Sequence, residues 1–159
     1  MTADTETSHM SDNRDPQRLQ TIEVLNRLHA AERRSLLPRL PETAAFVSWS
    51  SAAELEMVEK MVAEEGEHLA WLSEALDEAG GALYPAGPDI HTGHLHYLDL
   101  RVIMPEVIRS LEGLVRAYQD AAKVPMTPRA AEVVNRILRR HQAHLERLRA
   151  LETRAPAGA

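Results

Sequence analysis

The sequence contains no cysteine, and this absence limits the chemistry of any site in the protein. A chain without thiols cannot form disulfides, zinc-thiolate sites or iron–sulfur centres held by cysteine. Any bound metal ion must therefore be held by histidine, aspartate or glutamate side chains.

Long apolar runs are also absent, because charged residues interrupt every hydrophobic stretch. No run approaches the roughly 20 apolar residues that a membrane-spanning helix needs. The first 16 residues are polar and acidic, which is unlike a secretory signal. We therefore expect a soluble protein in the cytoplasm that makes no membrane contact.

Positive charge is in short supply, with 18 lysines and arginines against 24 aspartates and glutamates and a formal net charge of -6. A chain of this balance is repelled by the phosphate backbone of DNA or RNA. We therefore expect no nucleic-acid partner.

Aromatic residues make up only 4% of the sequence, and the β-branched clusters typical of strands are missing. Alanine, leucine, glutamate and arginine, which favour helices, dominate instead. We predict an all-α protein in which residues 17–152 form one four-helix bundle that binds metal. The predicted disordered tails are residues 1–16 and 153–159.

Apolar residues recur at helical spacing in four stretches. The third predicted helix begins between Leu95 and Pro105, where the proline either starts or kinks it. The fourth opens with Thr127 as its N-cap and Pro128 in its first turn. The predicted helices cover about residues 16–37, 51–80, 105–122 and 127–151.

Residues 80–93 hold many glycines and prolines and form the longest predicted connection. A short turn would make the second and third helices antiparallel. A connection of this length can cross the bundle from end to end, which makes the two helices parallel.

Side chains that bind metals interrupt the apolar stripe of every predicted helix near its middle. A buried carboxylate is unfavourable unless it is paired or coordinates a cation. Residues three apart lie on one face of a helix, so each closely spaced pair can share one ion. Carboxylates with imidazoles suit iron, manganese or zinc. The candidate ligands are Glu32, Glu65, His68, Glu112, His141 and His144.

This pattern resembles that of the ferritin-like di-iron carboxylate proteins, which include ferritins, bacterioferritins and rubrerythrins. Those proteins take one glutamate from each of two helices and a Glu-x-x-His pair from each of the other two. Glu32 and Glu112 match the lone glutamates, Glu65 and His68 match one pair, and His144 matches the histidine of the second pair. The resemblance implies a ferritin-like bundle with a long crossover between helices 2 and 3.

His141 departs from the family pattern, because it stands where the second pair has its glutamate. The remaining three candidate glutamates offer three negative charges, fewer than two divalent ions carry. The predicted cofactor is therefore iron, or manganese or zinc, bound as one or two ions.

The resemblance implies an iron- or manganese-dependent oxidoreductase that reacts with dioxygen or peroxide. Because the chain has no cysteine-held iron, its electrons would come from a donor protein or from substrate iron. One alternative is an iron storage or buffering protein with ferroxidase activity. Another is a non-catalytic helical interaction module, in which the inward polar residues only fix helix register. Assembly as a homodimer or other homo-oligomer is expected from the resemblance.

Several other residues near the stripes carry weaker signals. His29 lies three residues before Glu32 and is expected to support the site or to pack, with a ligand role as the alternative. A flexible surface loop is the favoured interpretation of His91, His94 and His96, with metal capture as the alternative. Solvated faces are expected for Glu64 and Glu67, and aromatic packing rather than electron relay for Trp71 and Tyr118.

Overall fold

The computed structural model describes residues 15–43, 52–88 and 91–154. Within them the chain forms four long helices and two short 3-10 helices, and no strand. The prediction of an all-α protein is confirmed. The long helices are α1 (Pro16–Arg33), α2 (Ala52–Glu78), α3 (Leu100–Ala122) and α4 (Pro128–Arg154), and the short ones are η2 (Leu37–Thr43) and η3 (Gly93–Leu95).

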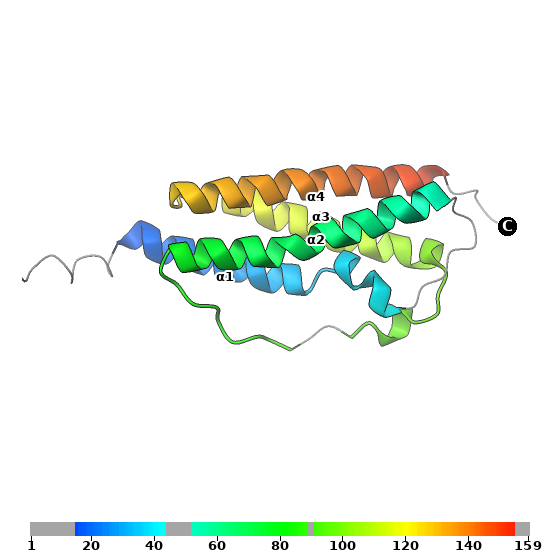
Figure 1. Cartoon of the computed structure of the whole chain (residues 1–159), viewed down its shortest axis with the longest axis horizontal. Coiled ribbons are helices and arrows are strands. Elements are labelled where there is room, and N and C mark those ends of the chain that lie inside the picture. Colours follow the sequence, from blue (N-terminus) through cyan, green and yellow to red (C-terminus); the bar gives the residue numbers. More distant parts are fainter. Residues whose placement is uncertain (1–14, 44–51, 89–90, 155–159) are drawn as a thin grey trace, which may run out of the picture.

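The long helices pack side by side with a ferritin-like topology (Figure 1). α1 and α4 run in one direction, whereas α2 and α3 both run in the opposite direction. The connection between α2 and α3 travels along the whole bundle to join them. The predicted crossover and the parallel second and third helices are confirmed.

The start of α1 and the end of α2 follow the local sequence. Asp15 caps α1, because its carboxylate accepts a hydrogen bond from the backbone N–H of Gln17. α2 ends before Gly80, whose φ of 72° lies in the left-handed region that favours glycine. The capping box predicted at Ser51 lies outside the described residues.

Two other helix boundaries differ from the predicted ones. α1 ends at Arg33, because the next residues lead into the 3-10 helix η2, where Pro38 disfavours the α conformation of Leu37. α3, by contrast, begins at Leu100, within the predicted range and behind the N-cap Asp99, so that Pro105 lies inside the helix. α4 continues to Arg154, slightly beyond the predicted end of the bundle.

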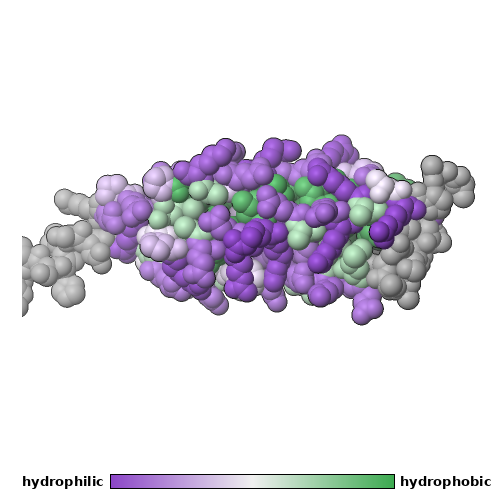
Figure 2. All heavy atoms as spheres, turned by 90° about the horizontal axis from the view of Figure 1, so that it is seen from above, coloured by the Kyte–Doolittle hydropathy of each residue, from purple (hydrophilic) through white to green (hydrophobic). Residues whose placement is uncertain are grey.

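The core is built mainly from leucine, isoleucine, valine and methionine on the facing sides of the helices. Hydrophilic side chains cover most of the face seen in Figure 2, with apolar atoms showing between them. None of the described helices is long and apolar enough to span a membrane. The core also buries ionisable side chains, namely Glu32, Glu65, His68, His141 and His144.

Candidate metal centre

Four of the six predicted ligands meet inside the bundle. Glu32 comes from α1, Glu65 and His68 come from α2, and His141 comes from α4. One ligand atom from each of the four residues lies within 4.8 Å of the others, and all four side chains are buried. Four sequence-distant carboxylate and imidazole groups thus converge at one point, as a metal site requires.

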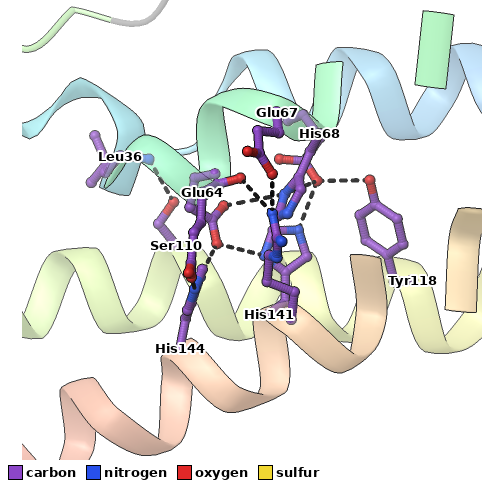
Figure 3. Close-up of polar contacts among 11 residues, drawn as sticks. Leu36, Glu64, Glu67, His68, Ser110, Tyr118, His141 and His144 are labelled. Carbon is purple, nitrogen blue, oxygen red and sulfur yellow. Dashed lines mark hydrogen bonds and ion pairs between the residues drawn. The ribbon is translucent and has the colours of Figure 1, made fainter. Parts of the chain in front are cut away.

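His141 bridges the two carboxylates at the centre of this cluster (Figure 3). Its Nε2 lies 2.7 Å from Oε1 of Glu32, and its Nδ1 lies 3.0 Å from Oε1 of Glu65. The ring of His68 stands edge-on to that of His141, with 4.7 Å between the ring centroids. His141 therefore occupies the position between α1 and α2 from which it can donate a hydrogen bond to each carboxylate.

Hydrogen bonds in this cluster shift the pKa values of its members. Burial raises the pKa of Glu32, but the hydrogen bond with His141 and the nearness of His68 outweigh burial and lower it to about 2. Burial also raises the pKa of Glu65, and contacts with His141 and His144 again lower it overall. For His141, burial lowers the pKa, but the bonds with both glutamates raise it from 6.5 to about 9. Without metal, the site is a buried imidazolium between two carboxylates.

His144, another predicted ligand, lies beside the four-residue cluster. Its Nδ1 is 2.6 Å from Oε1 of Glu65, and its Nε2 is 2.7 Å from Oε2 of Glu64. The side chain of Glu64 is 25% exposed, so this carboxylate is not on a fully solvated face as the sequence suggested. His144 connects the buried cluster to the bundle surface.

Glu112 is not brought to the cluster by the structure. Its Oε1 accepts a hydrogen bond of 2.6 Å from Nη2 of Arg149, and the side chain is 29% exposed. Each residue turns a helix by about 100°, and Leu111 takes the inward direction on this turn of α3. The ten buried residues of α3 include no acidic side chain. The match of Glu112 to the family's third-helix glutamate is therefore corrected.

Tyr118 is the residue that α3 contributes to the site. From the sequence, this side chain is expected only to pack against other aromatic groups. Its hydroxyl donates a hydrogen bond of 2.7 Å to Oε1 of Glu32, and it points into the cluster in Figure 3. Burial and the neighbouring Glu32 charge raise the pKa of Tyr118 well above its usual value, so it remains a donor. This phenol fixes the orientation of the Glu32 carboxylate.

Removing the Tyr118 hydroxyl should therefore destabilise the protein. Replacing Tyr118 with Phe takes a donor from a buried carboxylate, which is expected to lower the free energy of unfolding by about 1–3 kcal/mol. Urea denaturation of the metal-free protein measures this change. The matched control is Tyr97→Phe. Tyr97 is 76% exposed, so removing its hydroxyl should have little effect on the free energy of unfolding. Equal losses in the two variants would contradict the structural role of Tyr118.

The other histidines that the structure describes lie away from the cluster. His29 is half-buried, and burial and the charge of Arg33 lower its pKa. On the surface, Nε2 of His94 lies 3.2 Å from Oε1 of Glu106, while His91 and His96 are exposed. Among the described residues, the only group of three or more candidate ligands is the buried four-residue cluster.

The two other residues that the sequence singled out lie as expected. Glu67 is exposed and pairs with Arg140 at 2.6 Å. Trp71 packs beside His68, with ring centroids 5.6 Å apart, and its other contacts include the guanidinium groups of Arg136 and Arg140.

Three buried atoms in the cluster have no hydrogen-bond partner: Oε2 of Glu65 and both ring nitrogens of His68. Nδ1 of His68 is 3.5 Å from Glu32 and 3.6 Å from Glu65, without hydrogen-bond geometry. Buried polar atoms are normally satisfied, and a cation bound to Oε2 of Glu65 and to the unprotonated ring nitrogen of His68 would satisfy both of these acceptors. The donor set therefore fits a metal ion.

The fold is similar to that of a known iron protein. The chain matches the crystal structure of a bacterioferritin from Desulfovibrio desulfuricans with a TM-score of 0.62 and 19% sequence identity. The match covers 86% of this chain and 80% of the bacterioferritin, whose diiron site was observed in different catalytic states. This likeness defines the fold as a ferritin-like four-helix bundle. No protein-family model and no curated protein sequence matches the chain.

Proposed function

We propose that this protein binds one divalent transition metal, with iron as the first candidate, through Glu32, Glu65, His68 and His141. The unsatisfied atoms of Glu65 and His68 are the observation that carries this proposal. They lie in a buried site whose other polar groups have partners. Without a cation, the bundle would bury two acceptors, Oε2 of Glu65 and the unprotonated nitrogen of His68, without a partner and at a substantial cost in stability.

The charge of the site favours one ion over two. Glu32 and Glu65 together carry two negative charges, which neutralise one divalent cation. A second ion would need further anionic ligands. The buried face of α3 supplies only the protonated Tyr118, and Glu112 is paired with Arg149. In this respect the proposed centre differs from the diiron site of the bacterioferritin.

The proposed activity is that of an oxidoreductase acting on dioxygen or peroxide. A bound iron or manganese ion with two imidazole and two carboxylate ligands supplies one-electron redox chemistry and open positions for an oxidant. Tyr118 holds Glu32 in place, and His144 holds Glu65. The surrounding apolar core excludes bulk water from the ligands. A donor protein, assembly as a homodimer and a cytoplasmic location remain predictions.

Iron storage is the second candidate function, because the bacterioferritin fold supports it as well as it supports an oxidoreductase. Storage requires a large closed shell of subunits, whereas an oxidoreductase does not. The molar mass in solution, measured by light scattering, separates the two. A non-catalytic interaction module would bind no metal, whatever the size of its assembly.

Metal content per chain tests the proposed site directly. The protein purified without chelator is expected to hold about one iron or manganese ion by elemental analysis, and Glu65→Gln is expected to hold almost none. Glu112→Gln is the matched control, because it removes a glutamate that lies outside the cluster. About two ions per chain would contradict the one-metal site, and loss in both variants would contradict the assignment of ligands. No metal in the unmodified protein would overturn the proposal.

A further inference from the structure

A second site of interest lies between α1 and the crossover, away from the metal centre. The two segments enclose a hollow of about 260 Å³. Three arginines and one histidine line it, together with crossover residues 83–88, and none of the described residues that line it is acidic. The basic lining residues are Arg27, His29, Arg33 and Arg34.

Several arginines elsewhere on the bundle pair with carboxylates, whereas those of this hollow have no such partner among the described residues. On other faces, Arg129 pairs with Glu78, Arg140 with Glu67 and Arg149 with Glu112. No carboxylate of the described residues forms an ion pair with the arginines lining this hollow. Three guanidinium groups without a carboxylate partner in the described part of the chain are therefore gathered in one place on a protein whose net charge is -6.

The position of Arg34 brings its guanidinium close to the crossover backbone. A Cβ atom added to Gly87 would lie 3.2 Å from Nη2 of Arg34. Arg34 also lines an adjoining hollow of about 580 Å³, together with His91, His94 and Arg109. Among the described residues lining that hollow, the one acidic side chain, Glu106, already pairs with His94. Arg34 thus lies between the two hollows, and the basic residues that line them extend from α1 to α3.

We propose that the hollow between α1 and the crossover binds a phosphate group, carried by a small phosphorylated ligand or present as the free ion. Guanidinium groups bind phosphate through paired, charge-assisted hydrogen bonds. The side chains of Leu83 and Tyr84 line the same hollow and are 48% and 59% exposed, so they offer an apolar surface to a substituent on the phosphate. A ring or short chain next to the phosphate would cover them.

This site does not depend on the proposed metal. Glu32 precedes Arg33 in the sequence, but its side chain faces the interior while the arginine is exposed. Phosphate can also coordinate a bound metal ion, so the test must separate the two locations. The Glu65→Gln variant serves this purpose, because it alters the metal centre and leaves the arginines unchanged.

Titration calorimetry with inorganic phosphate at constant ionic strength tests the proposal. Saturable binding is expected in the unmodified protein and in Glu65→Gln. The double variant Arg33→Gln/Arg34→Gln is expected to bind about tenfold more weakly or worse, because it loses charged hydrogen-bond donors. Arg147→Gln is the matched control, since this exposed arginine of α4 lies outside both hollows and its removal should leave binding unchanged.

The outcomes distinguish the ligand sources and can overturn the site. Tighter binding of phenyl phosphate than of inorganic phosphate, lost on Tyr84→Ala, would support a phosphate ester as the ligand. Equal binding would support the free ion. The proposal fails if the unmodified protein shows no saturable binding, if Glu65→Gln abolishes it, or if the double variant and Arg147→Gln weaken it equally. Circular dichroism of each variant verifies that the helices are intact.

Discussion

The free energy of unfolding of the metal-free protein is expected to fall by about 3 kcal/mol as the pH rises from 6.5 to 10. His141 is the reason, because its pKa rises from 6.5 to about 9 in the folded protein. The folded state therefore binds the His141 proton more tightly than the unfolded state does. This contribution is fully present below pH 6.5 and is lost as the pH rises through 9.

The lowered pKa of Glu32 predicts the opposite trend at acid pH, where the free energy of unfolding should fall as the pH falls. Its pKa falls from 4.5 to about 2 on folding, so its contribution is fully present above pH 4.5 and is lost as the pH falls through 2. Both shifts arise largely from the same hydrogen bond of 2.7 Å, so their free energies are not additive. Between about pH 4.5 and 6.5 the pair should contribute its full stabilisation.

Urea denaturation with chelator present, measured from pH 4 to 10, determines this profile. His141→Gln should remove the loss of stability between pH 6.5 and 9. The control is His94→Gln, because His94 pairs with Glu106 on the surface and its removal should leave the profile unchanged. If the unmodified protein is equally stable at pH 6.5 and 10, the buried imidazolium is excluded.

The sequence predicts the fold well because two independent signals agree. Four apolar stripes at helical spacing predict four helices, and the glycine- and proline-rich connection is long enough to run along the bundle. The structure shows both features. The end of α1 was predicted less well, because residues 34–37 retain an apolar pattern after the α-helix has given way to a turn and η2.

The site is predictable where ligands occur as pairs. Glu65 with His68, and His141 with His144, lie three residues apart, so each pair shares a helix face whatever the exact rotation of the helix. Glu32 and Glu112 have no such partner. An apolar stripe is wide enough to leave the direction of a single residue undecided: α1 turns Glu32 into the cluster, whereas α3 turns Glu112 toward Arg149.

Tyr118 and Glu64 were not predicted as members of the network for a different physical reason. The reach of a side chain across the bundle depends on helix packing, which the periodicity of one helix does not contain. Tyr118 is long enough to bring its hydroxyl from α3 to Glu32 on α1. Glu64 lies at the edge of the buried face of α2 and reaches His144 on α4. In both cases the contact is between helices.

The affinity of the site for a divalent metal is expected to rise about 100-fold between pH 6.5 and 8.5. His141 carries a proton in the metal-free site up to its pKa of about 9, and this proton must leave before the ring can donate a lone pair to a metal. The carboxylates of Glu32 and Glu65 do not compete in this range, because their pKa values are lowered. Each pH unit below 9 therefore weakens binding about tenfold, and binding at pH 7.5 should release about one proton.

Competition with a chelator of known affinity measures this slope, with zinc as a redox-inert probe. Calorimetry in two buffers of different ionisation enthalpy counts the released protons. Glu112→Gln should keep both the slope and the proton release, since its carboxylate is paired with Arg149 outside the cluster. Tight binding that is independent of pH and releases no proton would show that the imidazolium of His141 stays intact, and would remove His141 from the ligand set. The metal-free protein thus gains stability from the same proton that opposes metal binding, so the pH that weakens the apo bundle should strengthen the metal site.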